Sequence, residues 1–318
     1  MRRLLTAACF CGWLLQAACP LLAFEIGDRV VVIREIAPGE GHAKGEVVGR
    51  NYHVVGREGT RLIVPGHDHW LEERDVLSPS QAQTHFEAIL LQNPEDAEVW
   101  RALAGIKANR DENTEALSDV ETSLRLEPDN LDALATRGAI LYKLGRMDEA
   151  IADFNAALSQ DSDQELALLG RSACRVAAGD LNLAWEDINL AVRLAPENEG
   201  IVQARGVVLA RLKRHQEAIA DFDRAIELNP TVGRAYAYRG VVRYNEKDEL
   251  KALADYNEAL RLDPLLTDAY LYRALLRMDQ DSYRLALRDL DRALKIDPNH
   301  TLCQRAKQIC IQLMEPDK

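Results

Sequence analysis

The chain has 318 residues, of which 47% are hydrophobic, 28% charged and 6% aromatic. This mixture is typical of an ordered, helix-rich protein and argues against intrinsic disorder. The formal net charge is −12 at pH 7, and no run of lysine and arginine offsets it. The charge therefore argues against nonspecific binding to nucleic acid.

The first 23 residues have the layout of a secretory signal peptide. Arg2 and Arg3 precede an apolar stretch that ends in small residues and contains no acidic residue. We therefore expect residues 1–23 to be a signal peptide and the mature chain, beginning at Phe24, to be exported to the periplasm or secreted. Two alternatives stay open. Cys19 would carry a lipid anchor, or an uncleaved N-terminal helix would hold the chain in a membrane.

Residues 24–78 differ in character from the rest of the chain. The segments DRVVVIR, GEVVGR, YHVVGRE and RLIVPG are short, rich in β-branched residues and separated by glycine, proline and asparagine. Such segments predict a small β-barrel of about five strands. The opening GDRVVVI and the closing HWLEERDVL resemble bacterial SH3-like domains. The resemblance implies an N-terminal SH3-like β-barrel but names no ligand for it.

A period of 34 residues organises the next part of the chain and holds without insertion from Ala97 to His300. It divides this part into six repeats: 97–130, 131–164, 165–198, 199–232, 233–266 and 267–300. Each repeat reads as two helices joined by a turn, which Gly145 and Gly179 mark in the second and third repeats. We expect residues 79–96 to be a half-repeat or linker helix, and residues 301–318 to be a capping helix and tail.

Four positions of the period carry the same kind of side chain in every repeat. The fourth is large: Trp100, Leu134, Leu168, Val202, Tyr236 and Tyr270. The eighth is small: Ala104, Gly138, Ser172, Gly206, Gly240 and Ala274. An alanine of the second helix recurs as Ala116, Ala150, Ala184, Ala218, Ala252 and Ala286, and four residues later come Val120, Phe154, Ile188, Phe222, Tyr256 and Leu290. This pattern resembles the tetratricopeptide repeat family. The resemblance implies a mainly α protein, a right-handed α-α superhelical solenoid.

Charged residues also recur in register. The seventh position holds Arg137, Arg171, Arg205, Arg239 and Arg273, and the second helices carry Asp119, Asp153, Asp187, Asp221, Asp255 and Asp289. The two series predict a structural ladder of bidentate ion pairs. Arg137 would pair with Asp153 within its repeat or with Asp119 of the repeat before it. The first repeat has Leu103 at the seventh position, so the count favours pairing across the repeat interface.

In tetratricopeptide solenoids the first helices line a concave face on which peptides or partner helices lie. The resemblance places these candidate binding residues on or beside that face: Arg101, Tyr142, Gln203, Arg211, Tyr238, Tyr244, Tyr272 and Met278. Small neighbours and tyrosines indicate a trough for an apolar peptide or an amphipathic helix. The lysines and asparagines with which some family members hold a terminal carboxylate are missing here.

The sequence shows no motif for catalysis or metal binding. His67 and His69 supply at most two ligands, and no P-loop, dinucleotide fingerprint or nucleophile elbow occurs. We therefore expect no enzyme activity, no cofactor and no metal. The favoured function is an exported scaffold that binds a partner protein or peptide. The alternative is an accessory protein of cell-wall metabolism whose SH3-like domain contacts peptidoglycan.

Overall fold

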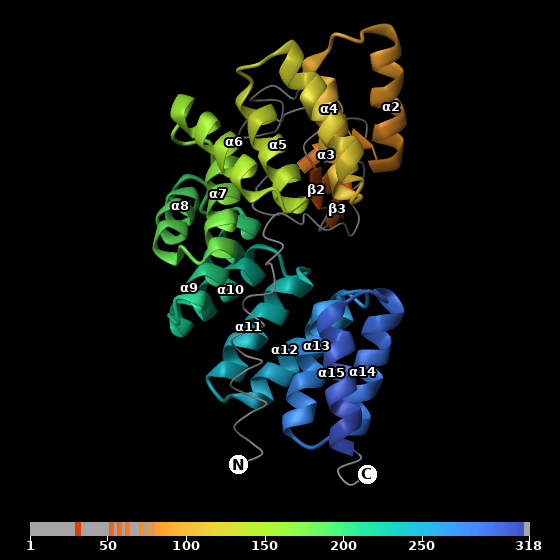
Figure 1. The fold of residues 1–318 in the computed structure, drawn as a ribbon, viewed down its shortest axis with the longest axis vertical. Coiled ribbons are helices and arrows are strands. Elements are labelled where there is room, and N and C mark those ends of the chain that lie inside the picture. Colours follow the sequence, from red (N-terminus) through yellow and green to blue (C-terminus); the bar gives the residue numbers. More distant parts are fainter. Residues whose placement is uncertain are drawn as a thin grey trace. The chain divides into compact units, whose positions relative to one another are not determined.

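The structure is a computed structural model that describes short strands between Arg29 and Leu77 and a continuous helical region over residues 79–314. Side chains are described over residues 81–314. The chain divides into two compact parts, one within Cys19–Ala204 and one that includes Arg205–Lys318, and each is treated by itself below. Figure 1 labels the helices of both parts. The predicted signal peptide lies outside the described residues.

The strands of the first part form two antiparallel sheets of three strands each. Their bounds are β1 (Arg29–Val32), β2 (Asn51–His53), β3 (Gly56–Glu58), β4 (Arg61–Ile63), β5 (Trp70–Glu72) and β6 (Val76–Leu77). The orders are β2-β1-β6 and β3-β4-β5, and no pairing joins the two sheets among the described residues. Two short separate sheets do not support a closed barrel. The SH3-like domain therefore stays a prediction.

Fourteen helices, α2 to α15, make up the described chain between Pro79 and Met314. The first part contains α2 (Pro79–Gln92), α3 (Ala97–Asn109), α4 (Asn113–Leu126), α5 (Leu131–Lys143), α6 (Met147–Gln160), α7 (Glu165–Ala178) and α8 (Leu181–Leu194). The boundary between the parts falls within α9 (Glu199–Arg211). The second part contains α10 (His215–Leu228), α11 (Gly233–Asn245), α12 (Glu249–Leu262), α13 (Thr267–Asp279), α14 (Tyr283–Ile296) and α15 (Thr301–Met314).

Local chemistry explains where the first helix of a repeat begins. The side chains of Asp96, Asn130 and Gln164 precede α3, α5 and α7, and each accepts a hydrogen bond from the backbone N–H three residues later. Such caps satisfy amide groups that have no partner inside the helix. The sequence therefore sets the start of these helices through single polar side chains.

The turn between the two helices of a repeat uses the left-handed backbone region each time. Gly145 and Gly179 adopt φ values of 76° and 89° there, as their residue type favours. The same position in the other repeats has a positive φ without glycine, at Asp111, Lys213, Lys247 and Asp281. A side chain in this region costs about 1–2 kcal/mol. Packing of the two helices therefore holds four of the turns in a conformation that their residues disfavour.

The small eighth position lets the two helices of a repeat approach closely, as the pattern predicts. A Cβ atom added to Gly138 would lie 2.7 Å from the ring of Phe154, which is fully buried. In the fifth repeat a Cβ on Gly240 would lie 2.6 Å from the ring of Tyr256. The large residue of the second helix thus fills the space that the glycine leaves.

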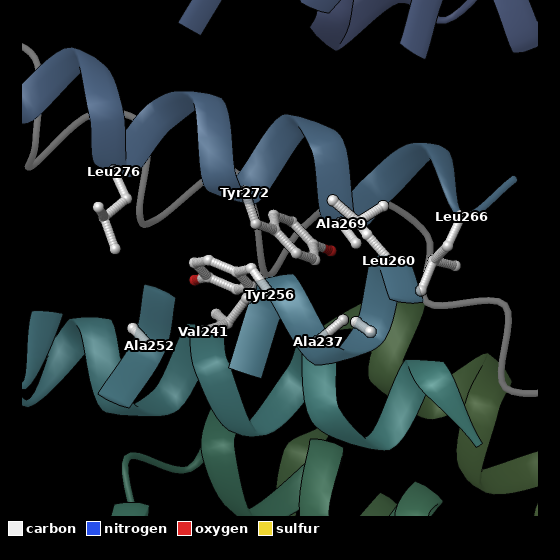
Figure 2. Close-up of a cluster of buried hydrophobic side chains, with 10 residues drawn as sticks. Ala237, Val241, Ala252, Tyr256, Leu260, Leu266, Ala269, Tyr272 and Leu276 are labelled. Atoms are coloured by element: carbon white, nitrogen blue, oxygen red, sulfur yellow. The ribbon is translucent and has the colours of Figure 1, made fainter. Parts of the chain in front are cut away.

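Neighbouring repeats also share a core, which Figure 2 shows for α11, α12 and α13. Tyr256 of α12 and Tyr272 of α13 face each other with ring centroids 6.0 Å apart. Smaller apolar side chains surround the pair: Ala237, Val241, Ala252, Ala259, Leu260, Leu266, Ala269 and Leu276. The two tyrosines therefore bridge consecutive repeats.

The helix α15 closes the second part. Cys303, Ala306 and Cys310 form its fully buried face, which packs against α13 and α14. At the positions where the repeats carry a large and a small apolar residue, α15 has Gln304 and Gln308, which are exposed. At these two positions α15 therefore differs from the first helices of the six repeats. None of the described helices is both long and apolar enough to cross a membrane.

Candidate partner-binding surface and its ion pairs

The arginines of the seventh position pair with the aspartate of their own repeat. Nε and Nη2 of Arg137 each donate a hydrogen bond of 2.7 Å to the carboxylate of Asp153. The same bidentate geometry joins Arg171 to Asp187, Arg205 to Asp221, Arg239 to Asp255 and Arg273 to Asp289. The expectation that Arg137 pairs with Asp119 was wrong.

Asp119 has a different cation. Nζ of Lys107 lies 2.6 Å from Oδ2 of Asp119. Lys107 occupies the eleventh position, one helical turn after Leu103, and therefore projects from the same face of α3. Burial raises the pKa of Asp119, and Lys107 opposes that rise. The count that favoured pairing between repeats failed because it considered only the seventh position.

The eleventh position adds a second cation in three further repeats. Arg175 contacts Asp187 at 2.6 Å, Arg243 contacts Asp255 at 2.8 Å, and Arg277 contacts Asp289 at 2.5 Å. The second and fourth repeats have Leu141 and Leu209 there, both buried. Every repeat thus places a cation at the seventh position, the eleventh, or both. The six aspartates are all buried, with 3–7% of their surface exposed.

Polar contacts also join each of several repeats to the one before, but their acceptors are not the buried aspartates. Nη1 of Arg171 donates to Oδ1 of Asn155 at 2.8 Å, and Nη1 of Arg273 donates to Oδ1 of Asn257 at 2.7 Å. Arg239 contacts Asp223 in the same way at 2.5 Å, and Lys307 of α15 contacts Asp291 at 2.7 Å. Each acceptor lies two residues after the aspartate of the preceding repeat. Arg171, Arg239 and Arg273 therefore hold their own repeat together and also connect it to the one before.

Three of the predicted binding residues are buried. Tyr142, Tyr272 and Met278 expose only 7%, 8% and 8% of their surface. Tyr272 packs on Tyr256, as described above. Neighbouring helices cover these side chains because the small residues of the repeats bring the helices close together. Their burial leaves little surface for a partner, so the prediction for these three residues is corrected.

Two more predicted residues are half-buried and engaged with other parts of the chain. The ring of Tyr238 lies 6.0 Å from that of Phe222. The hydroxyl of Tyr244 donates a hydrogen bond to Oδ2 of Asp279 in the next repeat. Burial, with a smaller contribution from Asp281, raises the pKa of Asp279. Both tyrosines therefore contribute to contacts within the array.

The three polar candidates are partly exposed. Glu98 binds the guanidinium of Arg101, whose side chain is 13% exposed. Burial lowers the pKa of Arg101, but the hydrogen bond and charge of Glu98 outweigh it, so the net shift is upward. Gln203 and Arg211 are also partly exposed. The buried Oε1 atom of Gln203 has no hydrogen-bond donor among the described residues.

The first helices α3 and α5 carry small residues that are partly exposed. A Cβ atom added to Gly105 would meet nothing within 4 Å, and Ala139 of α5 is partly exposed. Nζ of Lys143 donates to the carbonyl oxygen of Ala108 at 2.6 Å and lies 3.3 Å from Asp111. Small residues and a lysine that joins α5 to α3 therefore define a candidate surface, which we call the Gly105 surface. The sequence analysis missed Lys107 and Lys143; a cation recurs at the position of Lys107 in three other repeats, but the position of Lys143 carries no common residue type.

Two kinds of reactive site come into question among the described side chains, a metal-binding group and an activated cysteine. Among these side chains, no group of three or more His, Cys, Asp or Glu residues is placed to hold a metal ion. Burial raises the pKa of the Cys174 thiol to about 12, so this cysteine is a packing residue and not an activated nucleophile. The pair His67 and His69 lies outside the described residues.

Models of the tetratricopeptide repeat family match residues 103–175 and 204–232. No curated protein matches the chain. Among solved structures, a chain of the APC/C hetero-tetramer Cut9–Hcn1 has a TM-score of 0.64 and 20% identity, over 73% of this chain and 46% of that one. This chain therefore spans less than half of that relative.

Two other structures extend the comparison. A tetratricopeptide repeat protein from Parabacteroides merdae has a TM-score of 0.60 and 16% identity, over 73% of this chain and 92% of its own. Human IFIT1, a dimer with PPP-AAAA, has a TM-score of 0.66 and 17% identity, over 75% of this chain and 60% of its own. At such identities the likeness shows the fold alone. The chain contains tetratricopeptide repeats arranged as a helical solenoid, and this fold suggests a scaffold for protein–protein interaction.

Proposed function

We propose that this protein is an exported scaffold that binds a peptide or an amphipathic helix of a partner protein at the Gly105 surface. The observation that carries the proposal is the open space at Gly105, in the middle of α3, where a Cβ atom would meet nothing within 4 Å. A glycine there costs helix stability, and it lets the backbone of another chain approach closely. Ala139, on the first helix of the next repeat, is also small and partly exposed.

The neighbouring charges define what the partner offers. Glu98 balances Arg101, and Asp111 lies beside Lys143, so the rim of the surface has little net charge. A partner segment with small or apolar side chains toward Gly105 and polar side chains toward the rim fits this arrangement. A highly charged segment would gain little from it.

Photocrosslinking from position 105 of the Gly105 surface tests the proposal. A photoreactive p-benzoylphenylalanine is introduced at position 105, where a Cβ atom meets nothing within 4 Å, and the same group at Leu91, 87% exposed on α2, is the control. Irradiation in the native cell should yield a protein adduct from position 105 that is absent from position 91. Equal adducts from both positions, or none from position 105, would contradict the proposal.

The identity of the adduct separates the two functions. A glycan or a peptidoglycan stem peptide bound by the chain, unaffected by Ala139→Trp, would favour the cell-wall alternative. A protein segment whose adduct from position 105 is lost when Ala139→Trp is added would support the scaffold.

Export is a part of the proposal that rests on the leader sequence with Arg2 and Arg3. Mass spectrometry of the N-terminus of the protein isolated from its cell tests it. A terminus at Phe24 supports export with cleavage, a lipid on Cys19 supports the anchored form, and an intact Met1 in a cytosolic fraction contradicts export.

A further inference from the structure

Aromatic side chains at the fourth position of a repeat contact the loop that precedes that repeat. Nε1 of Trp100 donates a hydrogen bond of 2.9 Å to the carbonyl oxygen of Pro94. The hydroxyl of Tyr270 lies 3.4 Å from the carbonyl oxygen of Pro264, which has the same position in the repeat register. Both rings thus reach the loop that ends the preceding repeat and donate to the same backbone group.

The rings also contact the arginine of the seventh position. The guanidinium carbon of Arg239 lies 5.2 Å from the ring centroid of Tyr236, and that of Arg273 lies 5.7 Å from the ring centroid of Tyr270. These distances are within the range of a cation–π contact. An aromatic ring at this place therefore gains both a face contact with arginine and, when it carries a donor, a hydrogen bond.

The third repeat has a pocket at this place instead of a ring. Its fourth residue is Leu168, which is buried, and the loop before it has Ser162 where the other repeats have proline. The pocket has a volume of about 400 Å³ and is lined by residues of α6, α7 and α8, among them Ser159, Ser162, Leu168 and Arg171. The pocket is open to solvent, and its volume is sufficient for one aromatic side chain.

Two short side chains line the pocket. Ser159 of the second repeat occupies a position of the second helix where the first and fifth repeats carry Arg125 and Arg261. Leu168 of the third repeat is shorter than the tryptophan or tyrosine at the fourth position of the first, fifth and sixth repeats, while the second and fourth repeats carry leucine and valine there.

The polar groups of the pocket are held in place before any ligand arrives. Asp187 accepts from Nε and Nη2 of Arg171 at 2.9 Å and 2.7 Å, and Asn155 accepts from Nη1 at 2.8 Å. These three bonds fix the plane of the guanidinium. Such a preorganised arginine offers its face to a ring at little entropic cost.

We propose that this pocket binds a tyrosine or tryptophan side chain of a partner protein. The ring would lie against the guanidinium of Arg171, and its O–H or N–H would donate to the carbonyl oxygen of Ser162. The chain itself supplies such a ring at the corresponding place with Trp100, Tyr236 and Tyr270. The pocket lies apart from the Gly105 surface, and only the assumption that the ring comes from a protein rests on the proposed function.

Small amides that carry one side chain test the pocket without a known partner. The full-length protein, labelled with ¹⁵N, is titrated with N-acetyltyrosinamide, N-acetyltryptophanamide, N-acetylphenylalaninamide or N-acetylleucinamide. We expect saturable shifts of the amide signals of Ser159, Ser162 and Leu168 with the tyrosine and tryptophan amides. The phenylalanine amide should bind more weakly because it has no donor for Ser162, and the leucine amide should cause no saturable shift.

Two variants fill the pocket from within the chain. Ser159→Arg introduces the residue found at the same position of the first and fifth repeats, and Leu168→Tyr supplies the missing ring. Both should abolish the saturable shifts at Ser162, with circular dichroism confirming that the helices remain. The control Ser118→Arg changes an exposed serine on α4, outside the pocket, and should leave binding unchanged.

Three results would overturn the proposal: no saturable shift in the unmodified protein, equal shifts with the leucine amide, or shifts that persist in both filled variants. A negative crosslinking result at position 105 would not affect these measurements. Failure of the pocket and failure of the Gly105 surface are therefore distinguishable.

Discussion

Arg137 and Asp153 form a bidentate ion pair that joins the two helices of a single repeat, with both hydrogen bonds 2.7 Å long. The Asp153 side chain is 9% exposed and that of Arg137 is 30% exposed. In the next repeat, Asp187 binds both Arg171 and Arg175, whose side chains are less exposed than that of Arg137, at 19% and 21%. The number of charges that depend on one carboxylate therefore differs between otherwise similar repeats.

Removal of the carboxylate should cost more in the third repeat than in the second. Asp187→Ala leaves both Arg171 and Arg175 without their main partner and should lower the free energy of unfolding by roughly 3–5 kcal/mol. Asp153→Ala leaves one partly solvated arginine and should cost about 1–2 kcal/mol. Urea unfolding of both variants measures the difference. Equal losses would show that the second arginine contributes nothing.

The first two repeats provide an exchange test of the seventh and eleventh positions. Lys107→Leu strands the buried carboxylate of Asp119 and should lower the free energy of unfolding by roughly 2–3 kcal/mol. Adding Leu103→Arg recreates the arrangement of the second repeat, where Arg137 precedes Leu141 by one turn. Chemical unfolding should show that the double variant recovers most of the loss. A double variant no more stable than Lys107→Leu would contradict the equivalence of the two positions.

The same residues predict a pH dependence. Burial raises the pKa of Asp119 above its usual 3.8, and Lys107 opposes this rise. In Lys107→Leu the pKa of Asp119 should rise further, so the folded state holds the proton more tightly than the unfolded state. Its contribution to stability is then present below the unfolded pKa and is lost as the pH rises through the folded pKa.

The loss of stability in Lys107→Leu, measured against the wild type, should therefore shrink as the pH falls from about 7 toward about 4. Urea titrations at several pH values check this. The double variant with Leu103→Arg is the control, because its restored cation should make it follow the wild type. A loss of stability that is constant with pH would exclude stranding of the carboxylate as its cause.

Two glycines at different places of the first helices should respond in opposite directions to alanine. Gly105→Ala adds a methyl group in open space within α3 and should raise the free energy of unfolding by about 0.5–1 kcal/mol. Gly138→Ala would place a Cβ 2.7 Å from the ring of Phe154 and should lower it by about 1–3 kcal/mol. Thermal unfolding measures both. Destabilisation by Gly105→Ala would mean that its space is filled.

The helices were predictable because one pattern recurs in register. A fixed interval between large and small apolar residues can be read without knowing the fold, and the contact of Gly138 with Phe154 follows from it. The ion-pair ladder was predictable for the same reason. Its pairing was not, because Lys107 is a different residue type at a different position, and a count restricted to arginine overlooks it.

Exposure of the binding residues could not be read from the sequence. Helical spacing gives the direction of Tyr142 and Tyr272, but whether the next helix covers them depends on how closely the repeats pack. The pocket at Leu168 was missed for a related reason. It is lined by short side chains, among them Ser159 and Leu168, and short side chains of this kind form no recognisable motif.

Pairing within each repeat has a consequence for how such an array changes its length. Because the buried aspartate finds its cation inside its own 34 residues, a whole repeat inserted or deleted by recombination leaves no carboxylate stranded. The contacts that would be exchanged at the new junction involve side chains such as Asn155, which water can also satisfy. With respect to the buried aspartates the repeats are electrostatically self-contained modules: their number is free to vary while these carboxylates keep their cations, and only pairs across a boundary, such as Arg239 with Asp223, are exchanged.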